Sequence, residues 1–158
     1  MIEVTLSRAD LSDPQVVSLV QRHLLRARAA TAPGSAHALD VGELRAPEIS
    51  LWAAWEGGSL LGIAALKRLA SDHGEVKSMY TAENVRRRGV ARALLQHIVA
   101  EARSSGLARL SLETGSWDYF EPARALYRSL GFSACGPFAS YKPDPHSMFM
   151  TLDLRIRE

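Results

Sequence analysis

The spacing of apolar residues changes several times along the chain and divides it into strands and helices. Residues 2–7 alternate between apolar and polar, which is the period of a half-buried strand. The Ser12-Asp13-Pro14 sequence then supplies a helix start, and apolar residues recur at helical spacing to about Ala30. Between residues 31 and 47 proline and glycine interrupt any regular pattern, so we expect at most one short helix there.

Three strand-like runs follow, and we predict that they form an antiparallel meander. The first two, residues 49–55 and 60–69, flank the pair Gly57-Gly58. Two glycines between apolar runs are typical of a hairpin because both turn positions can adopt a positive φ. A polar tip at residues 71–74 leads to the third run, at residues 75–81.

The period then becomes helical again. From Val90 to Ala102 apolar residues recur in steps of one and three, which predicts a long helix that ends near Gly106. Pro122 and Gly131 mark the start and the end of a second helix. This second helix is predicted at residues 120–130. Strands are predicted at residues 107–114, 132–138 and 147–154.

The predicted order is β-α-(α)-β-β-β-α-β-α-β-β, where the bracketed helix is the short one. A meander, a crossover helix and a further strand imply a mixed sheet of about six or seven strands with about four helices on its two faces. The 158 residues suit one domain, and no repeat, low-complexity tract or linker divides them. We therefore predict an α/β fold in a single domain that spans residues 1–158.

Composition excludes several other classes of protein. Apolar residues make up 47% of the chain and charged residues 23%, as in an ordinary soluble globular protein. The single cysteine, Cys135, excludes an internal disulfide and a zinc site built from several cysteines, and we expect no metal site. No apolar run approaches the length of a membrane span. Because the N-terminal residues lack the basic start and apolar stretch of a signal peptide, we expect a cytoplasmic protein.

A basic turn separates the third strand of the meander from the long helix. Four of the 19 basic residues lie within residues 86–92, although the net charge of the chain is only +2. The helix begins near Gly89, and the first amide N–H groups of a helix lack partners inside it and carry the positive end of its dipole. This combination suits a phosphate or diphosphate. The alternatives are a solvated basic turn and a nucleic-acid surface, but the second needs basic residues spread along a face with aromatic residues between them.

Two motifs resemble those of a known family. Residues 86–91, Arg-Arg-Arg-Gly-Val-Ala, are similar to the R/Q-x-x-G-x-G/A signature of the GNAT N-acetyltransferase superfamily, and residues 123–132 resemble its later A-x-x-L-Y-x-x-x-G-F segment. The order of the predicted elements also matches, and the resemblance covers about residues 50–135 closely. It implies a GNAT-like fold and an enzyme that transfers an acetyl group from acetyl-coenzyme A (acetyl-CoA) to an amine.

The resemblance also implies which residues contact acetyl-CoA. In the family, backbone amides of the signature turn hold the diphosphate. The preceding strand offers its free backbone groups to the pantetheine arm, whose own amides let it act as an additional strand. The implied diphosphate contacts are Arg86, Arg87, Arg88, Gly89, Val90, Ala91 and Arg92, and the implied pantetheine contacts are Met79, Tyr80 and Thr81.

Attack of an amine on a thioester benefits from a base, because a lysine-like amine with a pKa near 10.4 is almost wholly protonated at neutral pH. Glu75 is the first candidate, since it lies eleven residues before Arg86, the spacing at which some histone-type members of the family place their glutamate base. Glu113, near the end of the next strand, is the alternative, and a water relay is a third. Without such a role Glu75 would be an ordinary surface carboxylate.

Tyr127 matches the tyrosine with which family members protonate the departing thiolate. A thiol with a pKa near 8.5 needs only modest help, so loss of this hydroxyl should lower turnover without abolishing it. Otherwise Tyr127 would be a core aromatic residue. Phe120 departs from the pattern, because many members carry asparagine seven residues before the tyrosine. We therefore expect no asparagine-mediated contact and a differently shaped helix entry.

The acceptor pocket of the family is usually lined by the segment after the first helix and by the last loop, here residues 35–40 and 138–147. We expect a small amine or an amino-acid-like acceptor, no nucleic-acid or membrane partner, and a monomer or homodimer. The candidate acceptor contacts are His37, Asp40, Glu113 and Tyr141. A non-catalytic acyl-CoA-binding regulatory module is the alternative function.

Overall fold

The computed structural model describes residues 4–30, 38–82 and 89–155. Its strands are β1 (Thr5–Arg8), β2 (Ile49–Glu56), β3 (Ser59–Arg68), β4 (His73–Thr81), β5 (Arg109–Gly115), β6 (Ser133–Cys135) and β7 (Ser147–Asp153). Its α-helices are α1 (Pro14–Ala30), α2 (Val90–Ser104) and α3 (Glu121–Ser129), and the described residues also form the short 3-10 helices η1 (Glu43–Arg45) and η3 (Asp118–Phe120). None of the described helices is long and apolar enough to cross a membrane.

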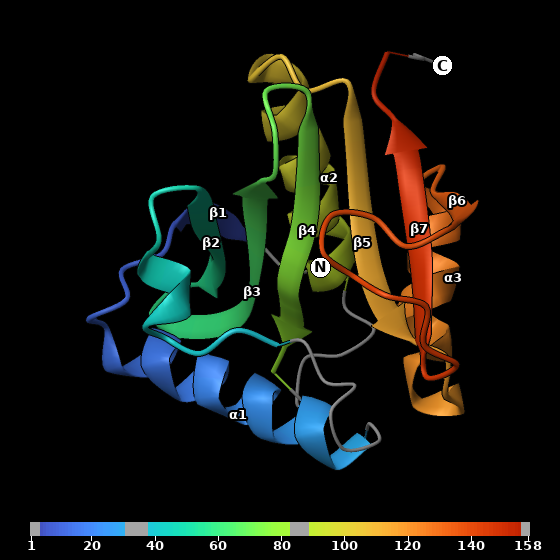
Figure 1. The fold of residues 1–158 in the computed structure, drawn as a ribbon. Helices are drawn as coiled ribbons and strands as arrows, with labels where there is room; N and C mark the ends of the chain where they lie inside the picture. Colours follow the sequence, from blue (N-terminus) through green and yellow to red (C-terminus); the bar gives the residue numbers. More distant parts are fainter. Residues whose placement is uncertain (1–3, 31–37, 83–88, 156–158) are drawn as a thin grey trace.

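The seven strands in the described part of the chain belong to one sheet, in the order β1-β2-β3-β4-β5-β7-β6 (Figure 1). β4 and β5 are parallel, and every other neighbouring pair is antiparallel. Helix α2 makes the crossover between the two parallel strands. The mixed sheet and the order of the elements confirm the predicted fold class, and the short helix expected between residues 31 and 47 is η1.

The predicted boundaries differ from the observed ones mainly at β6. This strand was expected at residues 132–138 and covers only Ser133–Cys135. The next residues are Gly136 and Pro137, and proline has no N–H with which to continue the ladder. The short strand pairs on one side with β7 and forms the edge of the sheet.

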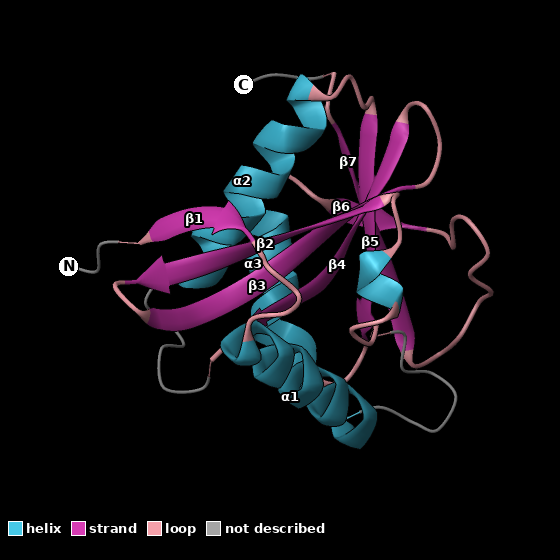
Figure 2. Ribbon diagram, turned by 90° about the vertical axis from the view of Figure 1, so that its left-hand side faces the viewer, coloured by secondary structure: helices cyan, strands magenta, loops and turns pink. Residues whose placement is uncertain are grey.

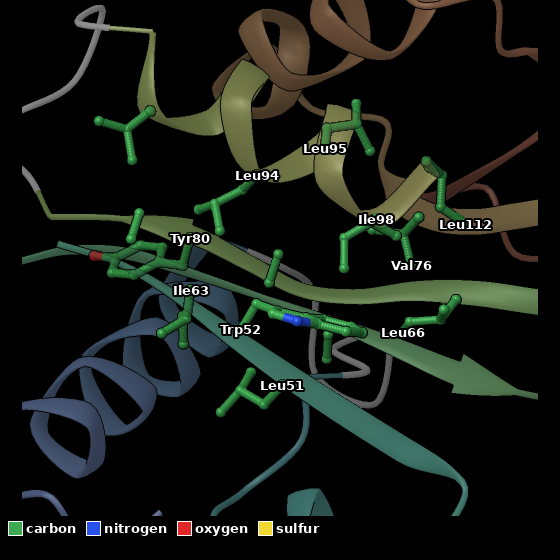
Figure 3. Packing of buried hydrophobic residues seen from close by; sticks show 14 of the residues in the cluster. Leu51, Trp52, Ile63, Leu66, Val76, Tyr80, Leu94, Leu95, Ile98 and Leu112 are labelled. Atoms are coloured by element: carbon green, nitrogen blue, oxygen red, sulfur yellow. The ribbon is translucent and has the colours of Figure 1, made fainter. Parts of the chain in front are cut away.

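Helices cover both faces of the sheet. Figure 2 shows the strands passing between α1 and α2. Leu94, Leu95 and Ile98 of α2 are fully buried against one face, together with Val76 of β4 (Figure 3). On the opposite face, Tyr80 of β4 packs its ring against a histidine of α1 at 4.9 Å. The core therefore fixes the N-terminal end of α2 on one side of β4 and the C-terminal half of α1 on the other.

The strands β4 and β5 pair only over their first halves. The paired residues run from His73 with Arg109 to Val76 with Leu112, and within the described residues the two strands share no later pair. Figure 1 shows them moving apart toward their C-terminal ends. Parallel strands that separate in this way leave backbone groups unpaired between them, so a ligand can enter the sheet at that point.

A bulge in β4 lies where the separation begins. Ile63 of β3 pairs with Tyr80 and Ala65 pairs with Lys77, so two residues of β4 face one residue of β3. One of these two, Ser78, has a φ of 54°, which is unusual for a residue other than glycine. The extra residue reverses the alternation of side chains, so that Lys77 and Tyr80 point to the same face as α1.

The packing of α2 can be tested with two leucines that differ in burial. Leu94→Ala removes a side chain with no exposed surface and should lower the free energy of unfolding by about 2–5 kcal/mol. Leu25→Ala removes one that is 66% exposed on α1 and should change it by less than about 0.5 kcal/mol. Chemical denaturation of the two variants measures both values, and equal losses would contradict this account of the core.

Candidate active site

Two neighbouring cavities occupy the space where β4 and β5 separate. The larger has a volume of about 480 Å³ and lies among α1, the N-terminal end of α2, and α3. The smaller has a volume of about 120 Å³ and lies between β4, β5 and the loop that carries Tyr141. Six residues line both cavities, namely His23, Ala27, Met79, Phe120, Ala123 and Tyr127.

The larger cavity ends at unpaired amides of α2. The first bond of the helix runs from the N–H of Ala93 to the carbonyl of Gly89, at 3.0 Å. The amides of residues 90–92 therefore precede the helical ladder, and they make no hydrogen bond to another described residue. Gly89 has a φ of 82°, and the space around its Cα is open. A group that accepts hydrogen bonds can reach these donors directly.

Several of the residues predicted to contact the coenzyme line this larger cavity. Those that line it are Met79, Tyr80, Thr81, Gly89, Ala91 and Arg92. The side chain of Val90 is 1% exposed and packs into the core, so that only its amide faces the helix end. Arg86, Arg87 and Arg88 lie outside the described residues.

A buried polar cluster occupies the smaller cavity. Oε2 of Glu75 accepts hydrogen bonds from the hydroxyl of Tyr141 at 2.6 Å and from Nζ of Lys77 at 3.3 Å. The Lys77 ammonium also donates to the Tyr141 hydroxyl at 2.8 Å and lies 5.5 Å from the centre of its ring. Only 3% of the Glu75 side chain and 9% of the Lys77 side chain are exposed. We call these three residues the Glu75–Lys77–Tyr141 cluster.

Burial and charge keep both tyrosines of the site protonated. Burial, together with the negative charge of Glu113, raises the pKa of Tyr127 to about 12. Burial also raises the pKa of Tyr141, to which the adjacent Glu75 carboxylate and the charge of Glu113 add. At neutral pH each hydroxyl is therefore a hydrogen-bond donor.

The structure thus brings together most of the candidate catalytic and acceptor residues. Glu75, Glu113, Tyr127 and Tyr141 all line the smaller cavity. Asp40 does not, because its carboxylate accepts the amide N–H of Glu43 at 2.8 Å and stabilises the start of η1. Its predicted contact with the acceptor therefore has no support from the geometry. His37 lies outside the described residues.

Two residues of the site were not singled out in the sequence. His23 lies on the inward face of α1, three residues after the buried Val20, and lines both cavities. Lys77 is two residues after Glu75 on β4, so both side chains point to the same face. Helical and strand periodicity could have placed both residues on these faces, but could not show that His23 lines both cavities or that Lys77 lines the smaller one.

Phe120 forms a wall of both cavities at the position where asparagine was expected from the family pattern. Its ring lies directly over Gly115, the last residue of β5, so that a Cβ at position 115 would collide with it. The buried Arg124 fixes this connection, because it donates to the carbonyl oxygens of Gly115 and Trp117 and pairs with Glu121 at 2.8 Å. The chain therefore enters α3 with the Phe120 ring packed against the backbone of Gly115.

This contact predicts a specific effect of a single methyl group. Gly115→Ala must displace the Phe120 ring from its place in the wall of both cavities, which should raise the KM for the ligands of both cavities and cost about 1–3 kcal/mol of stability. Gly58→Ala is the matched control, because a Cβ there meets nothing within 4 Å. Steady-state kinetics and denaturation test the pair, and unchanged KM values in Gly115→Ala would contradict the proposed role of the ring.

His23 predicts how stability depends on pH. Burial lowers its pKa from 6.5 to about 4, so the native state holds this imidazole neutral while the unfolded chain takes up a proton below about pH 6.5. Stability should therefore be full above pH 6.5 and be lost as the pH falls toward 4, by at most about 3 kcal/mol from this group.

Denaturation at pH 7 and pH 5 measures this loss, and His23→Asn should reduce it. An equal loss in the variant would assign the acid sensitivity to other groups. Burial also lowers the pKa of His73, which remains in both proteins and cancels from the comparison.

Comparisons with known proteins identify the family of the chain. The model of the acetyltransferase (GNAT) family matches residues 19–132. The "Uncharacterized N-acetyltransferase YsnE" of Bacillus subtilis (strain 168) is 54% identical over 92% of this chain and 96% of its own length. The "Uncharacterized N-acetyltransferase YedL" of Escherichia coli (strain K12) is 48% identical over 95% of this chain and 94% of its own length.

A solved structure shows the same fold at lower identity. The aminoglycoside 6'-N-acetyltransferase complexed with coenzyme A has a TM-score of 0.72 and 17% identity, covering 98% of this chain and 99% of that chain. No three described histidine, cysteine, aspartate or glutamate side chains gather as a group that could hold a metal ion. Because the family model covers most of the chain and both relatives carry the name of N-acetyltransferases, this protein belongs to the GNAT family and is an acetyltransferase.

Proposed function

We propose that the protein transfers an acetyl group from acetyl-CoA to the amine of a small acceptor, by direct attack of the amine on the thioester. The observation that carries the proposal is the shared wall of the two cavities. One cavity ends at the unpaired amides of α2, the other is lined by the buried carboxylate of Glu75 and the partly exposed carboxylate of Glu113, and Tyr127 lines both. The coenzyme in the related solved structure and the names of the relatives support the same reaction.

The larger cavity fits the coenzyme. The amides of residues 90–92 supply donors for a diphosphate at the positive end of the α2 dipole, and Gly89 leaves room for it. Arg92 adds a positive charge beside them, with one guanidinium nitrogen bonded to Ser129 at 3.0 Å. Met79, Tyr80 and Thr81 border the same cavity where β4 has left β5, and their strand would hold the pantetheine arm. When bound, the coenzyme supplies an activated acetyl group and a thiolate that departs readily.

Two carboxylates could take the proton of the amine, and the geometry favours Glu113. Oε2 of Glu75 already accepts hydrogen bonds from Tyr141 and Lys77, so this oxygen is engaged within the cluster. Glu113 lines the smaller cavity together with Tyr127, and its charge raises the pKa of both Tyr127 and Tyr141. We assign proton removal to Glu113 and a positioning role to Glu75, the first candidate from the sequence.

Tyr127 would serve as the general acid. Its side chain is buried, borders both cavities and makes no hydrogen bond to another described residue. With a pKa of about 12 it holds its proton at neutral pH and can donate it to the thiolate.

The assignment of the base predicts a difference between two variants. Glu113→Gln should lower kcat/KM by about 100-fold or more at pH 7, because the amine must then lose its proton without help. The deficit should narrow as the pH approaches the pKa of the amine. Glu75→Gln should lower kcat/KM by a smaller factor than Glu113→Gln does. Tyr127→Phe should lower kcat by about tenfold.

Release of free thiol from acetyl-CoA in the presence of a panel of amines measures these rates. Glu48→Gln, which alters an exposed carboxylate far from either cavity lining, is the matched control. A greater loss in Glu75→Gln than in Glu113→Gln would reverse the two assignments. Lack of thiol release with every amine would refute the proposed reaction.

A further inference from the structure

The smaller cavity contains a cation, although its proposed substrate is itself a cation before it reacts. The charged groups that line this cavity in the described part of the chain are Glu75, Glu113 and Lys77. Burial of an ammonium group is costly, and Lys77 would repel the ammonium form of an acceptor. Two carboxylates would suffice to attract a simple amine. The presence of Lys77 therefore points to a further feature of the acceptor.

The bonds of Lys77 leave it able to bind another group. An ammonium has three N–H donors. Nζ of Lys77 donates one hydrogen bond to the Tyr141 hydroxyl at 2.8 Å and one to Oε2 of Glu75 at 3.3 Å. Its third donor has no partner among the described residues. The bond to Glu75 is long, and the same carboxylate oxygen also accepts the hydrogen bond of Tyr141 at 2.6 Å. An acceptor carboxylate that enters the cavity can therefore take up the remaining donor.

The cavity has two chemically different ends. Tyr127 borders both cavities and so marks the end of the smaller one that meets the larger, and Glu113 lines the smaller cavity with it. Lys77 contacts Tyr141, which belongs to the loop between β6 and β7 and does not border the larger cavity. An acceptor with a positive and a negative group matches this arrangement, with its amine toward Glu113 and Tyr127 and its carboxylate toward Lys77.

We propose that the acceptor is a small amino acid and that Lys77 binds its carboxylate. The inference rests on the proposed function, and it names the class of acceptor. The smaller cavity, about 120 Å³ in volume, suits a short molecule in which amine and carboxylate are close together. Lys77 thereby determines specificity, since amines of the same shape without a negative charge leave its buried donor unpaired.

Matched pairs of amines test the inference. Each amino acid, for example glycine, alanine or β-alanine, is compared with its primary amide, which has the same shape and no negative charge. The wild-type enzyme should have the higher kcat/KM for the acid. In Lys77→Met the ratio of acid to amide should fall by about tenfold to a hundredfold, the effect expected for one hydrogen bond to a charged group. Lys77→Arg should retain more of the ratio than Lys77→Met.

Two controls separate recognition from a loss of structure. Lys142→Met removes an exposed positive charge next to Tyr141 and should leave the ratio unchanged. Calorimetry measures the binding of an N-acetyl amino acid in the presence of coenzyme A. The Kd for this product should rise in Lys77→Met by a factor similar to the fall in the acid-to-amide ratio. Binding of acetyl-CoA to the same variant checks that it is folded.

The outcomes distinguish this inference from the proposed function. A parallel fall for acid and amide in Lys77→Met would show that Lys77 only positions Glu75 and Tyr141, and would overturn the inference while the acetyl transfer stands. A wild-type preference for amides would overturn it as well. Failure to acetylate any amine, with acetyl-CoA still bound, would overturn the proposed function itself.

Discussion

The separation of β4 from β5 is the constraint on which the rest of the site depends. The two parallel strands pair from His73 to Val76 and then diverge, at a bulge in which Ser78 has a positive φ. Had the ladder continued, hydrogen bonds between the strands would have closed the space that both cavities occupy. Helices α2 and α1 pack against the two faces of β4 and so hold this strand in its position beside the opening between β4 and β5.

The gap brings charges into a place from which water is largely excluded. Glu75 is 2% exposed, and it remains tolerable there because Lys77 and Tyr141 satisfy one of its oxygens. The same desolvation raises the pKa of both tyrosines and lowers that of His23. Burial therefore favours the protonated hydroxyls of both tyrosines and the neutral imidazole of His23 near neutral pH.

Much of the fold was predictable because periodicity and turn residues reflect local physics. The meander, the long helix after Gly89 and the last strands were recognisable from the sequence, and β6 ended early only because Gly136-Pro137 interrupts its ladder. The site was less predictable. The motif located Tyr127 and the helix end, but the meeting of Lys77, Tyr141 and His23 results from the bulge and from a loop that folds back on β4, which no local pattern encodes.

The seating of Phe120 on Gly115 links two positions that lie five residues apart in the sequence. A side chain at the first position and a ring at the second exclude each other, so neither can be exchanged freely while the other stays as it is. A homologue with a smaller residue in place of Phe120 can replace Gly115 by a residue with a side chain. A homologue that keeps the ring cannot. The pair should therefore covary during divergence, and the order in which the two mutations occur should matter.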